Sequence, residues 1–276
     1  MNADAIAGTL ALIAEDMYGD PNNTAPPFDE RIYGLGYVSA GYLTAVDAIF
    51  RDSKLAWEIG GERRFYGVIL RGPDKPDEIT VVIRGTEGAI EWAIDAECEL
   101  MSPFEDRAQQ VESGFYGLYQ TMRFTVQSDT KTELDFSAFA KYFEPESVTV
   151  IGHSLGAAMA CYCAHELAGL LAPVPVALRA FAPPRPGNAA YVAALASAVP
   201  DCKAFVYEPD IVPDVPPVAL GYTSAPGIVQ LDKSREIEDS TLCNHHALSY
   251  VHLLDPTVAE LAVGSRDAHY SSCLIC

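Results

Sequence analysis

Near its start the chain carries apolar residues at helical spacing, over residues 4–18. These positions are Ile6, Leu10, Leu12, Ile13 and Met17. With Asp4 in the first turn, the spacing predicts an amphipathic opening helix. We expect a second helix over Ser39–Phe50, with the Pro- and Asn-rich stretch Pro21–Pro27 as the loop between the two helices.

Two runs rich in β-branched and aromatic residues follow, at Phe65–Arg71 and Ile79–Arg84. The turn-forming stretch Gly72–Asp77 separates them. This arrangement is typical of an antiparallel hairpin.

The rhythm then changes to that of an α/β fold. Val148–Ile151 is a short continuous apolar run, which is typical of a strand buried on both faces, and the Ala-rich stretch Leu155–Leu171 after it has helical character. The alternation repeats as strand, helix and strand at Val176–Phe181, Asn188–Ala198 and Ala204–Tyr207. Parallel strands with helical crossovers are the economical topology for this order. The Pro- and Gly-rich region Pro213–Ser240 is expected to be loop or short hairpin.

Composition bounds the partners and the location. At 276 residues, with 49% hydrophobic and 20% charged residues, the chain fits a single globular α/β domain over residues 1–276. A formal net charge of −20 repels phosphate backbones, so we exclude nucleic acid as a partner.

Met1–Ala5 holds no Lys or Arg before the first apolar stretch, and no apolar run has the length of a membrane span. We therefore expect a cytoplasmic protein whose lipid contacts, if any, are peripheral.

The seven cysteines are odd in number and irregularly spaced, which matches neither a disulfide framework nor a zinc pattern. We expect reduced thiols and no metal. The last four residues, Cys273–Cys276, have the outline of a prenylation signal on Cys273, although cysteine is atypical at the final position. A flexible tail from about residue 264 is the simpler interpretation.

The candidate chemistry centres on Gly152-His153-Ser154-Leu155-Gly156. This pattern follows the buried strand and opens the Ala-rich helix, which is the setting of a nucleophile elbow. Glycine is needed at both flanks because side chains there would collide with neighbouring backbone. Ser154 is thus the candidate nucleophile, and the alternative is a serine that only caps the helix.

Several segments, taken in order, resemble the class 3 lipase family. Besides the elbow they are Val81-Val82-Ile83-Arg84-Gly85-Thr86, Val111-Glu112-Ser113-Gly114-Phe115 and Phe181-Ala182-Pro183-Pro184-Arg185-Pro186-Gly187-Asn188. Glu112 stands where the family usually has His. The resemblance implies an α/β-hydrolase fold, with a mostly parallel central sheet, an antiparallel N-terminal hairpin and helices on both faces.

The resemblance also implies an oxyanion hole and a lid. Thr86 and the backbone N–H of Leu155 would hold the oxyanion, and Asp95 would steady the Thr86 hydroxyl from behind. Residues 87–97 would form a short amphipathic lid that covers the site or meets lipid. Its apolar, substrate-facing positions would be Ile90, Trp92 and Ile94, although a buried core segment would have a similar composition.

A serine nucleophile needs a base and an acid, which follow it in the order acid then histidine in this fold. Asp210 directly follows the strand Ala204–Tyr207 and begins Asp210-Ile211-Val212-Pro213, which resembles the family's acid segment; Asp214 is the fallback. The base lies in the tandem pair His245-His246. We favour His245, because Tyr250 follows it by five positions, as in bacterial and plant members. His246 remains the alternative base.

The sequence therefore predicts a serine hydrolase that cleaves carboxylic esters of lipid-like substrates, such as a triacylglycerol lipase or esterase, without a cofactor. A phospholipase A1 or a feruloyl-type aryl esterase on the same scaffold is the alternative. A catalytically silent binding module is a remote third hypothesis, which the retention of the nucleophile, acid and base disfavours.

Overall fold

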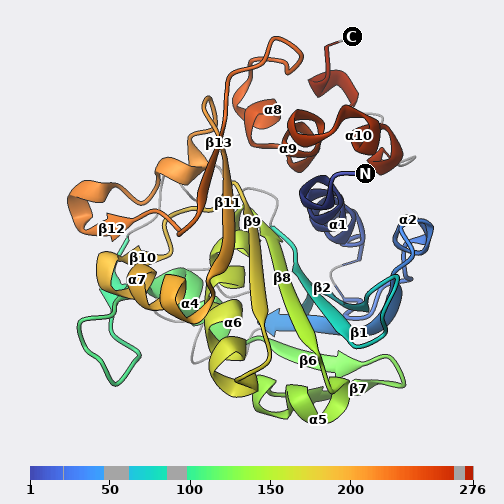
Figure 1. Cartoon of the computed structure of the whole chain (residues 1–276), viewed down its shortest axis with the longest axis vertical. Helices are drawn as coiled ribbons and strands as arrows, with labels where there is room; N and C mark the ends of the chain where they lie inside the picture. The colour runs from blue at the N-terminus through green and yellow to red at the C-terminus, as the bar shows by residue number, and fades with distance from the viewer. Residues whose placement is uncertain (21, 47–61, 86–97, 264–270, 276) are drawn as a thin grey trace.

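A mixed β-sheet crosses the middle of the molecule (Figure 1). The computed structural model describes residues 1–20, 22–46, 62–85, 98–263 and 271–275. Within these residues the sheet has nine strands in the order β13-β11-β9-β8-β3-β2-β1-β6-β7. A second, four-stranded sheet has the order β12-β10-β5-β4.

The strands of the large sheet are β1 (Val38–Val46), β2 (Arg63–Arg71), β3 (Glu78–Ile83), β6 (Arg123–Val126), β7 (Asp129–Leu134), β8 (Ser147–His153), β9 (Val176–Phe181), β11 (Asp201–Tyr207) and β13 (Ile228–Leu231). Those of the small sheet are β4 (Leu100–Met101), β5 (Val111–Glu112), β10 (Gly187–Asn188) and β12 (Tyr222–Thr223). The α-helices are α1 (Ala3–Asp16), α2 (Glu30–Gly34), α4 (Ser113–Gln120), α5 (Phe139–Phe143), α6 (Leu155–Leu171), α7 (Ala189–Ala198), α8 (Thr241–His245), α9 (Ala247–Leu254) and α10 (Pro256–Ala262). Short 3₁₀ turns are η1 (Phe136–Ala138), η2 (Val212–Asp214), η3 (Val218–Leu220) and η5 (Ser271–Cys273).

The large sheet has a parallel half and an antiparallel half that meet at β3. From β3 through β8, β9 and β11 to β13 all neighbours are parallel, whereas β3, β2, β1, β6 and β7 pair antiparallel. The predicted hairpin and the predicted parallel strands are both confirmed. The prediction of loop or short hairpin over Pro213–Ser240 is wrong at β13, which joins the sheet edge in parallel to β11; its four residues are too few to show a strand pattern by themselves.

The predicted helix over Ser39–Phe50 is wrong over the residues described, because Val38–Val46 forms strand β1. This strand lies between β2 and β6 and pairs with both. A Cβ at Gly41 would overlap the carbonyl of Thr125, so the close strand pairing needs glycine here. Pairing on both edges outweighs the local helical preference of the Ala- and Leu-containing sequence.

Helices cover both faces of the sheet (Figure 1). One face packs against α4 and α6, with α7 packed on α6, and the other packs against α1, over which α9 and α10 lie. The opening helix exists as predicted, but it is not amphipathic, because every residue from Ala7 to Ala14 is buried. A Cβ at Gly8 would lie 2.9 Å from Val251 Cγ2 and 3.2 Å from Phe181 Cε1, which shows how tightly α1 is held between the sheet and α9.

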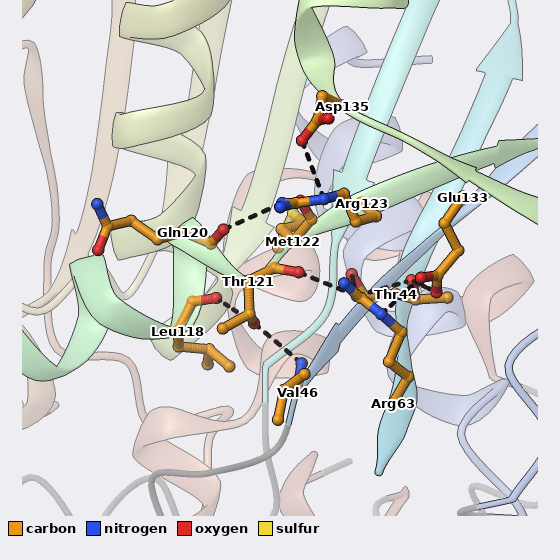
Figure 2. A network of polar contacts seen from close by, with 10 residues as sticks. All are labelled: Thr44, Val46, Arg63, Leu118, Gln120, Thr121, Met122, Arg123, Glu133 and Asp135. Atoms are coloured by element: carbon orange, nitrogen blue, oxygen red, sulfur yellow. Dashed lines mark hydrogen bonds and ion pairs between the residues drawn. The ribbon is translucent and has the colours of Figure 1, made fainter. Parts of the chain in front are cut away.

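A polar network fixes the antiparallel half where β1 ends and β2 begins (Figure 2). Arg63 Nε contacts Glu133 Oε2 at 2.7 Å, and Arg63 Nη1 donates to the carbonyl of Thr121 at 2.9 Å. The Thr121 hydroxyl accepts the N–H of Val46 at 2.9 Å. The network therefore ties both strand ends to α4 and β7.

The expectation of reduced cysteines is wrong for one pair, since Cys243 and Cys273 form a disulfide. The fold brings these residues, which are 30 positions apart, to a Cα–Cα distance of 5.2 Å. Spacing along the chain does not reveal such a contact. In this form the Cys273 sulfur is bonded and is not free for prenylation. Of the segment predicted as a flexible tail, residues 273–275 pair with residues 236–238.

Candidate active site

A sharp turn between β8 and α6 carries Ser154. The residue has φ 56° and ψ −129°, a conformation that side chains rarely adopt, and its N–H donates to the carbonyl of Phe181 at 2.9 Å. Cβ atoms at Gly152 and Gly156 would overlap the carbonyls of Gly156 and Ile83. The elbow predicted from the sequence is confirmed as a backbone feature, and the two glycines allow it.

His245 links Ser154 to Asp210. Its Nε2 lies 2.8 Å from Ser154 Oγ, and its Nδ1 lies 2.8 Å from Asp210 Oδ2. Each of the three residues is at most 6% exposed. Ser154 comes from the elbow, Asp210 from the loop after β11 and His245 from the end of α8. The three side chains form a continuous and largely buried chain of hydrogen bonds.

The Asp210 carboxylate is held from two further directions. Its Oδ1 accepts the N–H of Val212 at 2.9 Å, and its Oδ2 accepts the hydroxyl of Tyr250 at 2.6 Å. Burial and the nearby Asp210 charge raise the pKa of Tyr250 well above its ordinary value, so this hydroxyl remains a donor. In the sequence, Tyr250 only favours His245 over His246 through its spacing, and its contact with the acid is not predicted. Its spacing from His245 was the available signal for a contact with the acid.

The alternatives left open by the sequence point elsewhere. The His246 side chain caps α9, accepting the N–H of Leu248 at its Nδ1 at 3.2 Å. Asp214 pairs with Arg185 at 2.8 Å, and its side chain is 79% exposed. Of the two histidines and two aspartates considered, the structure brings His245 and Asp210 to Ser154.

The remaining predicted site residues are only partly placed. Leu155 is the first residue of α6, so its N–H is one of the helix-start groups that have no partner within the helix. Thr86 and Asp95, together with the lid positions Ile90, Trp92 and Ile94 in residues 87–97, lie outside the described residues.

The candidate nucleophile is buried, and the surrounding residues offer neither a metal site nor a membrane-spanning helix in the part of the chain that the structure describes. Ser154 is 2% exposed, so neighbouring residues cover almost all of it. No set of His, Cys, Asp and Glu suited to a metal ion occurs among the residues that the structure describes. Within the same residues, no helix combines the length and the apolar character needed to cross a membrane.

The family model for lipase (class 3) matches residues 80–220, just over half of the chain. The chain belongs to the class 3 lipase family. The match begins in β3 and spans the elbow and Asp210.

Among curated relatives, this class 3 family member is 30% identical over 183 residues to "Phospholipase A1 EG1, chloroplastic/mitochondrial" of Oryza sativa subsp. indica, covering 58% of this chain and 42% of that protein. It is 28% identical over 210 residues to "Phospholipase A1-II 1" of the same subspecies, covering 66% and 51%. The chain thus spans about half the length of the curated relatives it matches.

Solved structures show the fold. Lipase II from Rhizopus niveus aligns with a TM-score of 0.54 at 20% identity, over 87% of this chain and 82% of that one. A mutant form of MDLA from Penicillium cyclopium aligns with a TM-score of 0.57 at 20% identity over the same shares. The α/β-hydrolase fold implied by the sequence is therefore confirmed.

Proposed function

We propose that this protein hydrolyses carboxylic esters of lipid-like molecules, with Ser154 as nucleophile, His245 as general base and Asp210 as the carboxylate that orients the base. The observation that carries the proposal is that His245 contacts Ser154 and Asp210 at 2.8 Å each. A histidine held in this way can accept the serine proton and become an imidazolium beside a carboxylate.

The reaction follows from these contacts. His245 Nε2 takes the Ser154 hydroxyl proton while Oγ attacks the ester carbonyl carbon, and a tetrahedral oxyanion forms. The oxyanion collapses, the alcohol leaves with the proton returned by His245, and an acyl-Ser154 ester remains. Water, deprotonated by His245, then attacks this ester and releases the carboxylic acid and the free serine.

The N–H of Leu155, at the start of α6, supports the oxyanion, because helix-start N–H groups favour negative charge. By resemblance to the family, Thr86 supplies the second donor. Each such donor lowers the barrier by about 2.7 to 4 kcal/mol in related chemistry.

A chain-length series of p-nitrophenyl esters tests the proposal on the wild type and on Ser154→Ala. We expect a fall in kcat of about 10⁴-fold or more in Ser154→Ala, because the covalent step is lost. The exposed Ser137 provides the matched control Ser137→Ala, which should keep the wild-type rate. Equal rates in the wild type and Ser154→Ala would overturn the proposal.

Phospholipase A1 activity is the second candidate, because the curated relatives carry that description. Rates on emulsified triacylglycerol and on phosphatidylcholine vesicles would separate it from triacylglycerol lipase activity. The net charge of −20 predicts slower hydrolysis of anionic phosphatidylglycerol vesicles than of zwitterionic ones at low ionic strength. A wild type that cleaves triacylglycerol but neither phospholipid would exclude this candidate.

A further inference from the structure

Next to Ser154, His245 and Asp210 lies a second histidine–carboxylate pair, formed by His153 and Glu15, which the proposed chemistry does not use. Glu15, near the end of α1, contacts His153 Nδ1 through Oε1 at 2.8 Å. His153 Nε2 lies 2.8 Å from the carbonyl oxygen of His245. The His153 side chain is 5% exposed and that of Glu15 is 24% exposed, so the contacts are largely protected from water.

The geometry favours a charged His153. Both of its ring nitrogens face oxygen atoms, and a carbonyl oxygen accepts only, so a carboxylate at Glu15 requires a proton on each nitrogen. Burial lowers the pKa of His153, but the Glu15 charge and hydrogen bond outweigh it and hold this pKa above the ordinary value. For Glu15, burial raises the pKa, yet His153 and the Gly85 N–H bring it below the ordinary value.

The same Glu15 oxygen also accepts the backbone N–H of Gly85 at 3.1 Å. Gly85 is packed closely here, because a Cβ on it would lie 2.5 Å from Glu15 Oε1 and 3.3 Å from Ser154 Cβ. Gly85 directly precedes Thr86. One oxygen on α1 therefore contacts both the residue before the nucleophile and the segment that leads to the second oxyanion donor.

The rings of His153 and His245 lie side by side, with centroids 4.9 Å apart and planes tilted by 34°. Glu15 contacts His153 at Nδ1, whereas the backbone carbonyl of His245 contacts His153 at Nε2. The positive end of the pair therefore faces the base.

We infer that Glu15 and His153 are positioning residues for the proposed ester hydrolysis: their ion pair fixes the backbone of the base His245 and of Gly85 relative to Ser154, and places a positive charge beside the base. The inference rests on the proposed function and deepens it. The opening helix thereby contributes to the site although it lies far from Ser154 in the sequence.

The charge state of the pair depends on every titratable group that faces it. Among the residues that the structure describes, these groups are Asp210, His245, His246 and Tyr250. A change made at Glu15 alone leaves all four in place, so a shift in the pH profile can be traced to the pair.

Glu15→Gln tests the inference, because it keeps the side-chain shape and removes the charge. We expect kcat to fall by about ten- to a hundred-fold with KM within about twofold, since the loss is one of alignment. The acid limb of kcat/KM should move to higher pH by about half a unit or more, because an uncharged His153 no longer opposes protonation of the neighbouring base.

Asp16→Asn is the matched control on the same helix. The Asp16 carboxylate, with 14% of its side chain exposed, pairs with Arg31 at 2.7 Å. This variant should lower the melting temperature while kcat and the acid limb stay at wild-type values. A merely structural role of Glu15 predicts the same outcome for Glu15→Gln, and that result would overturn the inference.

His153→Gln provides a second route that decides the matter if Glu15→Gln does not fold. It removes the positive charge from the other partner, so the same loss of kcat and the same shift of the acid limb are expected. In the double variant the loss should not exceed that of the worse single variant, because the pair acts as one unit. An inactive wild type would overturn the proposed function, whereas an active wild type with unchanged single variants would overturn this inference alone.

Discussion

Two histidines that are adjacent in sequence, His245 and His246, have different surroundings at the level of single residues. His245 ends α8 with its ring between Ser154 and Asp210, and His246 precedes α9 and caps it. Of the two, His245 is the one placed to act as the proposed base, because its ring contacts both Ser154 and Asp210.

Replacing His245 by Gln should reduce kcat on a p-nitrophenyl ester by about 10⁴-fold or more, because the proton acceptor is lost. His246→Asn is the matched control. It keeps an acceptor for the Leu248 N–H and should retain the rate within about twofold. The reverse ranking of the two variants would contradict the assignment of the base.

Glu112 gives a pH prediction for stability. It is 1% exposed and caps α4 by accepting the N–H of Phe115 at 2.6 Å. Burial raises its pKa from 4.5 to about 7 despite that hydrogen bond. The pKa of Glu112 is higher in the folded than in the unfolded state. Its contribution to the stability of the fold is therefore fully present below about pH 4.5 and is lost as the pH rises through about 7.

Glu112→Gln should therefore be more stable than the wild type at about pH 8, by about 2 to 3 kcal/mol, and nearly equal to it at about pH 4. Urea unfolding at the two pH values provides the measurement. The exposed Glu105→Gln serves as control and should leave the wild-type pH dependence unchanged. If the free energies of unfolding of Glu112→Gln and the wild type differ by the same amount at both pH values, the buried carboxyl does not titrate as described.

The sequence reveals some of these residues and hides others. Asp210 follows a recognisable strand and His245 has a local spacing to Tyr250, so both could be selected before the fold was known. Glu15 contacts His153 across 138 positions. Nothing in a local pattern shows that a carboxylate on the opening helix faces the elbow.

At the scale of elements, prediction succeeded where periodicity and tertiary setting agree. The helix α6 begins and ends at the predicted residues, because it is long and follows a clear strand and turn. The helix predicted at β1 is wrong, since the pairing of this strand with β2 and β6 cannot be inferred from its own sequence. For α1 the helix was predicted but not its burial, which depends on α9 and α10 from the other end of the chain.

The disulfide connects two such distant elements, α8 and η5. Replacing both Cys243 and Cys273 by Ser should lower the free energy of unfolding by about 3 kcal/mol, because a closed loop of 30 residues is released in the unfolded chain. Thermal unfolding with and without a reducing agent provides the measurement. The wild type should lose stability on reduction and the double variant should not.

Cys202→Ser is the control, because serine can keep the hydrogen bond to the Val199 carbonyl. It should leave the response to reduction unchanged. A wild type whose unfolding does not respond to complete reduction, as measured by free thiols, would contradict a stabilising role for this bond.

At the scale of the whole molecule, the site exists only because distant segments meet. Ser154 lies 91 positions from His245, and His245 lies 35 positions from Asp210. The parallel half of the sheet brings the ends of β8 and β11 to one edge, and α1 and α9 pack beside them (Figure 1). Sequence order and the family resemblance predict this convergence. The distances, and the contacts that Tyr250 and His153 make with the site, are known only from the structure.

Labelling with a fluorophosphonate probe tests the central claim most directly, because the reagent reacts with a serine that a neighbouring histidine activates. Intact mass and peptide mapping should show one adduct, located on Ser154, in the wild type. The adduct should be absent in Ser154→Ala and strongly slowed in His245→Gln. A folded wild-type protein that forms no adduct on Ser154 would contradict the account.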